Sequence, residues 1–513
     1  MQKTKKFQPV KLVKKVFNDY RTSDTSGSKM SVKEFVSYGF GEFSLGSLNM
    51  VIDVYFMMFL TQVLRVPPLE VGIFMFVVRI VEIFRDPIVA MIIDGTRTRW
   101  GRFKPYIMVF AAPTAAMSVM FFFNAGATMD ARITFAYFTF ILSGVFRTFH
   151  GMGFVGLQNS LSNDNDEKSK YFTIGAFGRI FAGTMPGFIP LVLGFAPNFG
   201  INIRIIFIFC AVLFCSIGVI ATVFIKNLRE RVILPKQENP LRSINKILKN
   251  RHIWLIWSDK IGSFFQHIGW TIQIWVFWYV FGNIAFQSIM WTVTSVPTFF
   301  MAAFAPWVLK RIHPSRFVII HNLLQAACFA IMFFFGFGLW GGGLPAMIPL
   351  LVLSTVAAIT GRIREISGQI LNTDCLDYIE VKTGQRYEAT TGAANSLLDR
   401  AVLAFVGLMA GVLLAGIGFE SGARTQTPET LNGIWLIYCW FIAGGHLLSA
   451  IPYVFYRLRG DKQKRIKEEL DRRKDILQQG GELVINYERV CVEVLGERPR
   501  GVRRKANWTH NND

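Results

Sequence analysis

The stretch VRIVEIFRDPIVAMIIDGTRTRWGRFKPYIMVF, residues 78–110, combines two properties that seldom occur together. Its first half is apolar like a membrane-spanning helix, yet it carries four charged residues within eight positions: Arg79, Glu82, Arg85 and Asp86. A basic run at 97–104 separates it from the next apolar segment. Charges inside a spanning helix are costly, so a cluster of them indicates a protein interior or watery cavity with a function.

The composition places this stretch in a polytopic α-helical membrane protein. Of 513 residues, 52% are hydrophobic and only 17% are charged, whereas soluble domains average about 25% charged residues. Apolar runs of about 20 residues recur along the chain, and each is long enough to cross a bilayer as a helix. A transmembrane β-barrel would show short alternating segments, and these runs are continuous.

The apolar runs predict twelve transmembrane helices in two bundles of six. We expect a basic arm at 1–34, a first bundle at 35–226, a linker at 227–251, a second bundle at 252–457 and a charged tail at 458–513. The tail segment DKQKRIKEELDRRKDILQQ predicts an exposed charged helix. The predicted spans are 37–64, 68–94, 104–125, 131–160, 170–195, 202–226, 252–281, 285–308, 316–338, 345–372, 388–418 and 430–457.

The basic residues predict the orientation. Lys and Arg collect in alternate loops, including 96–104, 310–316 and 380–386, and in both terminal segments. By the positive-inside rule both termini are expected in the cytoplasm, with the helices in the plasma (inner) membrane. The net charge of +21 is then explained without a nucleic-acid partner. The arm either lies on anionic lipid or is a disordered cytoplasmic segment. The six cysteines show no CxxC spacing, so neither a disulfide framework nor a metal site is predicted.

The two acids of the opening stretch predict a cation site. Glu82 and Asp86 are four residues apart and therefore share one face of a helix. Two carboxylates this close favour binding of a proton or a small cation. Arg79, one turn before Glu82, offsets part of the negative charge, whereas Arg85 is expected to face an acid on another helix.

Other predicted spans carry polar stripes at helical spacing, in both bundles. A polar cavity near mid-membrane between two bundles is typical of a secondary transporter. Alternatively, the charged residues form structural pairs that lock helices together. The stripes contain Glu42, Asn49 and Asp53; Arg147 and His150; Arg179; Asp259, Lys260, Ser263, His267 and Trp270; Arg362, Arg364, Glu365, Gln369 and Asn372; and Asn395, Asp399 and Arg400.

Four segments resemble one known family. YGFGEF at 38–43, RIVEIFRDP at 79–87, TRTRWGRFKP at 96–105 and DCLDYIEVKTGQRYE at 374–388 are similar to the glycoside–pentoside–hexuronide:cation symporters of the melibiose-carrier type, within the major facilitator superfamily. Order and spacing match across roughly residues 35–460. The resemblance implies cation-coupled sugar uptake by a twelve-helix, two-bundle fold, with no cofactor beyond the coupling ion.

The resemblance also implies roles for individual residues. Glu82 and Asp86 match the cation-binding carboxylates, Thr148 matches a hydroxyl that assists them, and Asp53 is a further candidate. The substrate-binding candidates are Arg179, Arg147, His150, Arg400, Asp399, Glu365, His267 and Trp270; of these, Arg179 matches a sugar-binding arginine and Arg400 lies where the family has a lysine. The gating candidates are Asp94, Arg97, Arg99, Arg102, Asp374, Asp377 and Arg386, and the basic loop is expected to pair with the acids among them.

Two departures from the family pattern concern the coupling ion and the sugar. A sugar-binding aspartate of the first helix aligns with Gly46, and a third acid of the fourth helix aligns with Gly151. The sodium site is therefore incomplete, and proton coupling is preferred because a proton needs only one titratable acid. Sodium coupling or uncoupled transport remain the alternatives.

Additional arginines in the spans suggest an acidic substrate. Arg85, Arg147, Arg362 and Arg364 add positive charge, and arginine suits bidentate binding of a carboxylate or sulfate. A uronide or sulfated glycoside would fit. The alternative is that each arginine pairs with an acid of the protein. An enzyme is not expected, since no HExxH or GxSxG motif occurs. A sensor derived from a transporter is a further alternative, and the sequence does not indicate an oligomeric state.

Overall fold

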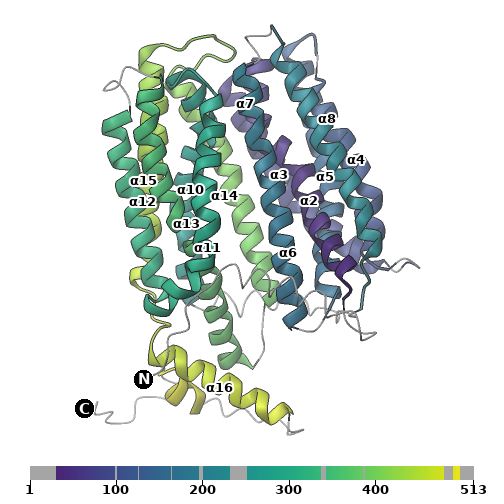
Figure 1. Cartoon of the computed structure of the whole chain (residues 1–513), viewed down its shortest axis with the longest axis vertical. Helices are drawn as coiled ribbons and strands as arrows, with labels where there is room; N and C mark the ends of the chain where they lie inside the picture. The colour runs from purple at the N-terminus through teal and green to yellow at the C-terminus, as the bar shows by residue number, and fades with distance from the viewer. Residues whose placement is uncertain are drawn as a thin grey trace.

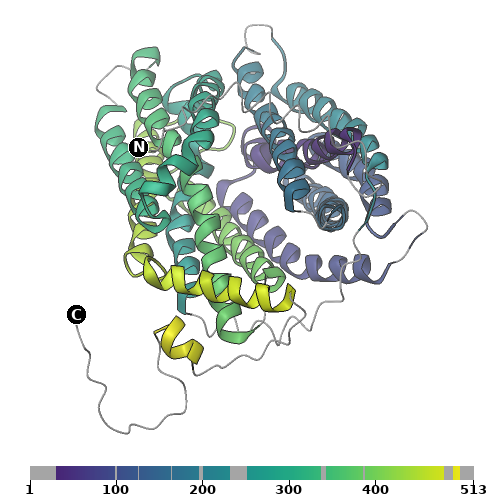
Figure 2. The same cartoon turned by 60° about the horizontal axis from the view of Figure 1, so that its bottom comes forward.

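A computed structural model of the chain describes residues 30–96, 98, 101–124, 126–162, 165–195, 200–231, 251–336, 343–384, 388–478 and 489–496. Over these residues the chain is almost entirely helical, and its long helices stand side by side in two bundles (Figures 1 and 2). Residues 1–29, most of the predicted linker and the end of the tail lie outside the described residues.

Among the described residues, the N-terminal bundle contains six spans, three of which continue as short helices of other types. They are α2 (Val32–Met58) with η2 (Phe59–Val63), α3 (Pro68–Gly95), α4 (Lys104–Phe122), α5 (Met129–Ser160), α6 (Asn165–Thr184) with η3 (Met185–Gly187) and α7 (Phe188–Phe195), and α8 (Ile203–Thr222) with η5 (Val223–Asn227). In this bundle α2 packs on α6 and α8, while α4 packs on α5 and α8.

The C-terminal bundle also contains six spans. They are α10 (Arg251–Trp275) with η6 (Val276–Val280), α11 (Ala285–Arg311), α12 (Pro314–Gly336), α13 (Gly343–Thr383), α14 (Glu388–Gly416) and α15 (Pro428–Val454). Here α15 packs on α10 and α12, and α13 packs on α11 and α12. After it come the tail helix α16 (Asp461–Gln478) and the short η7 (Val490–Val494).

Nine of these spans, among the described residues, are long and apolar enough to cross a membrane by length and composition. The other three helices, α3, α10 and α11, have similar lengths; α3 and α10 carry charged groups, namely Glu82 and Asp86 in α3 and Asp259 and Lys260 in α10. Large apolar side chains cover the outside of both bundles, such as Phe84, Met91, Phe181, Ile220 and Phe334. The predicted fold, twelve spans in two bundles, is therefore what the chain adopts.

Local sequence signals explain where the helices differ from the predicted spans. The first helix begins at Val32, five residues before the predicted start, because Ser31 and Glu34 form a capping box. The fifth predicted span is broken at Pro186, within η3. Helix α13 has 41 residues and is about 60 Å long, so it projects beyond the roughly 30 Å of a bilayer core toward α16 (Figure 1).

The buried apolar residues show how the bundles are joined. At the end opposite α16, one hydrophobic cluster includes residues of both bundles, with Phe74 and Met75 of α3 in the same cluster as Val406 and Ala410 of α14. Toward the α16 end, the described core separates into one cluster around Phe103 in the N-terminal bundle and another around Tyr378 in the C-terminal bundle. The apolar packing that joins the bundles therefore lies opposite α16.

Close approach of α3 and α14 depends on glycine. A Cβ atom on Gly411 would lie 2.5 Å from the Pro68 carbonyl oxygen, and one on Gly407 would lie 2.5 Å from Cβ of Met75. Neither position can accept a larger residue unless the helices move apart. Small residues at such contacts are typical of membrane helices, because they let the backbones meet.

The charged tail helix is folded against the protein rather than fully exposed, which corrects one prediction. Ile466 and Leu470 of α16 are buried against α13. Arg473 donates hydrogen bonds to the carbonyl oxygens of Glu380 and Val381 at the end of α13. Burial alone would raise the pKa of Glu469, but hydrogen bonds from neighbouring arginines outweigh it and hold that pKa below its usual range. The tail thereby caps the projecting end of α13.

Candidate functional site

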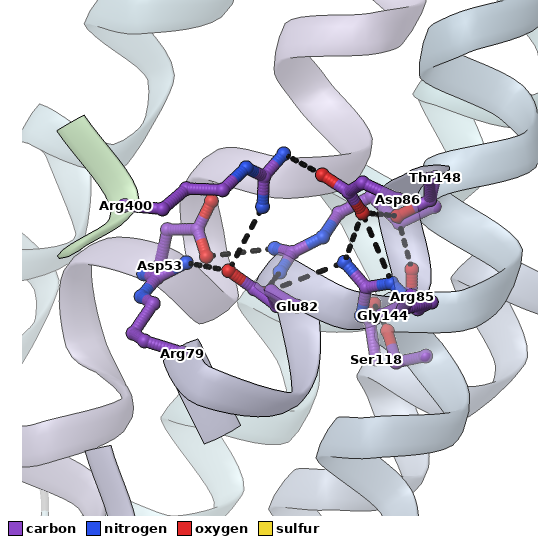
Figure 3. Close-up of polar contacts among 11 residues, drawn as sticks. Asp53, Arg79, Glu82, Arg85, Asp86, Ser118, Gly144, Thr148 and Arg400 are labelled. Atoms are coloured by element: carbon purple, nitrogen blue, oxygen red, sulfur yellow. Dashed lines mark hydrogen bonds and ion pairs between the residues drawn. The ribbon is translucent and has the colours of Figure 1, made fainter. Parts of the chain in front are cut away.

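Charged residues from four helices meet near the middle of α3 (Figure 3). They come from α2, α3, α5 and α14, so both bundles contribute. The cluster consists of Asp53, Arg79, Glu82, Arg85, Asp86, Arg147, Thr148 and Arg400, and we call it the central charge cluster. Spacing predicted Arg79, Glu82 and Asp86 of α3 to share a face, and in the structure Arg79 pairs with Glu82 at 2.7 Å.

Glu82 is the most buried member of the cluster, with an exposed fraction of 1%. Its Oε2 atom accepts hydrogen bonds from Nη1 of Arg79 at 2.7 Å and Nη1 of Arg400 at 3.1 Å. Its Oε1 atom accepts from Nη2 of Arg147 at 3.3 Å. A buried carboxylate is tolerated when it is paired in this way.

Asp86 is held by three side chains from three helices. Its Oδ1 atom accepts from Nη2 of Arg85 at 3.2 Å and from Oγ1 of Thr148 at 3.2 Å. Its Oδ2 atom forms an ion pair with Nη2 of Arg400. Arg400 therefore contacts both Glu82 and Asp86, and it does so from the opposite bundle.

The charge balance of the cluster is positive. Four arginines, Arg79, Arg85, Arg147 and Arg400, face the three acids Asp53, Glu82 and Asp86, which leaves one excess positive charge when all are ionised. Each carboxylate oxygen of Glu82 and Asp86 has at least one donor or cation within 3.3 Å.

The side chain of Arg85 contacts the acids of its own helix, so the prediction that it faces an acid on another helix is wrong. It lies 3.7 Å from Glu82 and 3.2 Å from Asp86. Gly144 of α5 makes this possible, because a Cβ atom there would lie 2.3 Å from Nη1 of Arg85. No pattern in the sequence predicted that α5 would come this close.

Arg147 is paired within the cluster. Its Nη1 atom donates to Oδ1 of Asp53 at 2.7 Å, and its Nη2 atom reaches Glu82. The other additional arginines are also paired: Arg362 with Glu365 at 2.8 Å and Arg364 with Asp259 at 2.9 Å. The structure thus supports the alternative in which each added arginine pairs with an acid of the protein. The main argument for an acidic substrate, the presence of unpaired arginines, therefore no longer holds.

The remaining substrate candidates are dispersed. His150 is buried and has no hydrogen-bond partner among the described residues, so it does not join the cluster. Asp399 pairs with Lys260, and Glu365 pairs with Arg362 on its own helix. His267 is exposed, with Nδ1 at 2.6 Å from the Ser263 carbonyl oxygen.

Two further candidates have partners that the sequence did not reveal. Trp270 packs edge-on against Phe329 and Tyr438 within the C-terminal bundle. Arg179, which has no acid nearby on its own helix, pairs with Glu42 of α2.

The gating residues are only partly described. Arg97, Arg99 and Arg386, and the side chain of Asp94, lie outside the described residues, so their pairing stays a prediction. Asp377 lies on α13. Asp374 accepts a hydrogen bond from Nε2 of Gln463 at 2.8 Å, because α16 packs against α13, and its pairing with the basic loop in the outward-open state stays a prediction.

The basic loop itself is anchored by an acid that sequence reasoning missed. The Glu230 carboxylate accepts backbone hydrogen bonds from Arg102 at 2.9 Å and from Phe103 at 3.0 Å. These N–H groups lie just before the first residue of α4, Lys104, where the N-cap residue makes no side-chain hydrogen bond to the helix. The carboxylate therefore serves as the N-terminal cap of α4 from 127 residues away.

Comparison with known proteins agrees with this architecture. A model of the family described as MFS/sugar transport protein matches residues 37–460. The chain belongs to this sugar-transport family. The resemblance to melibiose-type symporters and the predicted class, secondary transport of sugars, are confirmed, and the membership extends over both bundles.

Individual relatives in this sugar-transport family are distant. The isoprimeverose transporter of Lactiplantibacillus pentosus is 26% identical and aligns over 83% of this chain and 88% of its own. A putative sulfoquinovose importer of Salmonella typhimurium is 23% identical over 87% and 94%. The crystal structure of a D-xylose–proton symporter shares the fold, with a TM-score of 0.55 at 11% identity, covering 83% of this chain and 97% of that one.

Replacing Arg147 with glutamine should destabilise the transporter and impair all substrates alike. The change removes the arginine that pairs with Asp53 and one of the donors to the buried Glu82, which costs on the order of 3 kcal/mol. The thermal midpoint of the purified variant would measure this. The matched change Arg362→Gln breaks an exposed pair and should cost less than about 1 kcal/mol. If Arg147→Gln has a normal thermal midpoint and loses transport only of uronides, Arg147 is a substrate-binding residue instead.

Proposed function

We propose that this protein is a proton-coupled sugar symporter in which Glu82 and Asp86 form the coupling site. The observation that carries the proposal is the contact of Arg400 with both carboxylates across the two bundles. Alternating access in this fold moves one bundle relative to the other, so such a contact is made and broken during each cycle.

The proton and Arg400 compete for the same carboxylate oxygens. When Glu82 or Asp86 is ionised, Arg400 binds it and holds α14 against α3. Protonation removes the negative charge, and a guanidinium gains little from a neutral acid in a cluster that is already positive. The bundles are then free to separate here. By linkage, the movement that withdraws Arg400 favours uptake of the proton to the same extent.

Sodium coupling has less support than proton coupling. The donors around Glu82 and Asp86 already occupy their oxygens, and Gly151 stands where the resembled symporters have a third acid. Sodium binds through several oxygen ligands at once. A single proton needs only one carboxylate oxygen.

The apolar packing supports a conformation that is closed opposite α16. There the bundles share a hydrophobic cluster and Oγ of Ser421 donates to the Val66 carbonyl oxygen at 2.7 Å. We place the α16 end in the cytoplasm of the plasma (inner) membrane, because the described residues of the basic loop, at the start of α4, and the charged helix α16 lie at that end. The sugar would therefore leave toward the cytoplasm from this conformation.

Sugar-induced movement of protons would test the coupling. Energy-depleted cells that produce the protein would receive, one at a time, neutral mono- and disaccharides and glycosides, while electrodes record pH and sodium in the medium. We expect alkalinisation with at least one sugar and no fall in sodium. A fall in sodium without a pH change would establish sodium coupling, and sugar entry without either change would establish uncoupled transport.

A further inference from the structure

A second charged pair lies away from the central charge cluster, on the contact between α2 and α6. Oε1 of Glu42 accepts hydrogen bonds from Oη of Tyr38, at 2.7 Å, and from Nη1 of Arg179. Glu42 and Tyr38 are both buried, with exposed fractions of 4% and 0%, whereas the Arg179 side chain is 49% exposed. The arginine is therefore fixed at one nitrogen and accessible over much of its remaining surface.

The backbones of α2 and α6 are so close here that few side chains fit. A Cβ atom on Gly178 would lie 2.2 Å from the Gly39 carbonyl oxygen, and one on Gly46 would lie 2.5 Å from Cβ of Ala182. Residue 46 therefore has no room for an acid in this packing. Glu42 lies one turn earlier on the same face of α2, so the acid that reaches α6 comes from there.

Gly175 provides the space that Glu42 occupies. A Cβ atom at this position would lie 2.4 Å from Cε1 of Tyr38 and 3.0 Å from Cγ of Glu42. With glycine there, both side chains pack against α6 and their hydroxyl and carboxylate groups meet. The orientation of Arg179 is consequently set by the packing of the helices and not by a substrate.

The pair has no net charge, which determines what it can bind. A guanidinium has five N–H donors, and those not used by Glu42 can donate to hydroxyl groups. An unpaired arginine would strongly prefer a carboxylate or sulfate. Because the charge of Arg179 is already balanced by Glu42, an anionic ligand finds no excess positive charge at this site. The buried carboxylate of Glu42 also repels such a ligand.

We propose that Glu42 is a specificity-determining residue: it positions Arg179 and cancels its charge, so that this site binds hydroxyl groups of a neutral glycoside and disfavours the matching uronide. The proposal rests on the proposed sugar symport, with Arg179 as a substrate contact. It assigns to Glu42 a positioning role, and contact with the sugar to Arg179.

Binding of matched ligand pairs would test this proposal. The probes are the p-nitrophenyl β-glucoside and β-glucuronide, and the galactoside and galacturonide, measured by equilibrium dialysis against purified protein. The wild type should bind at least one neutral member more tightly than its uronide. In Glu42→Gln the charge of Arg179 is no longer balanced by a carboxylate. The affinity for the neutral glycoside divided by the affinity for its uronide should therefore fall about tenfold, as expected for one charge-assisted hydrogen bond. Glu42→Asp keeps the charge and should keep the wild-type preference.

Three results would overturn the proposal. An equal loss of affinity for the neutral glycoside and its uronide in Glu42→Gln would show that Glu42 has only a structural role. If the glutamine variant does not fold, Tyr38→Phe, which removes only the hydroxyl, is measured in its place. A wild type that binds no neutral glycoside, or prefers the uronides, also contradicts it. Arg179→Gln with unchanged binding would remove Arg179 from the sugar site, while the proton measurements above would still decide the symport mechanism independently.

Discussion

Replacing Asp86 with asparagine should abolish accumulation of sugar against a gradient. Asparagine retains the shape of the side chain and can still accept from Thr148, but it carries no charge for Arg400 and cannot exchange a proton. A gradient of one pH unit can drive about tenfold accumulation when one proton moves with each sugar. The variant should bring the sugar only to equal concentrations on both sides, while sugar exchange down a gradient continues.

Accumulation and counterflow in the same membrane vesicles would measure the two activities separately. Asp130→Asn is a matched control, because this aspartate is exposed in the first turn of α5 and far from the central charge cluster in sequence and contacts. It should accumulate sugar normally. If Asp86→Asn still concentrates sugar with normal pH dependence, Asp86 is not part of the coupling site. Loss of both accumulation and exchange would indicate a folding defect instead.

Replacing Arg400 with glutamine should uncouple proton movement from sugar movement. Glutamine cannot form the two ion pairs that join α14 to Glu82 and Asp86, so the bundles can reorient with either acid ionised. Allosteric couplings of about 1–3 kcal/mol correspond to 5–150-fold effects. We therefore expect at least a tenfold smaller proton-driven accumulation, with substantial downhill transport.

The lysine variant is the informative control for Arg400. Related symporters have a lysine at this position, and lysine keeps the charge but lacks the planar fork that reaches two carboxylates. Arg400→Lys should therefore remain coupled at a reduced rate, and the number of protons that enter with each sugar should stay unchanged. Full coupling in Arg400→Gln would show that the contact between bundles is not the coupling device.

The sequence predicted the helices well because membrane insertion imposes a simple rule on each one. A run of apolar residues must satisfy its own backbone hydrogen bonds, so length and hydrophobicity alone identify it. This holds even for α3, where only the charges break the pattern. The ends were less predictable: Ser31 starts α2 early, and the polar residues after 372 continue α13 to Thr383, because outside the bilayer hydropathy no longer marks the end of a helix.

The site was predictable only within single helices. Spacing of three and four residues placed Arg79 and Glu82 on one face, and the structure pairs them at 2.7 Å. The pairing of Arg85 was predicted differently, and Glu42 was noted only as part of a stripe. Each of these depends on how closely two helices approach, which small residues such as Gly144 and Gly175 decide.

By itself, then, the sequence determined that this is a twelve-helix transporter with acids and arginines on the inward faces of its spans, since helical periodicity and the cost of charge in a membrane act on each helix separately. Only the tertiary structure decided which charges meet. Arg400 reaches Glu82 across 318 positions, and Arg179 reaches Glu42 across 137. Ion pairs require contact within a few ångströms, and that distance is set by the packing of neighbouring helices, which no local pattern in the chain contains.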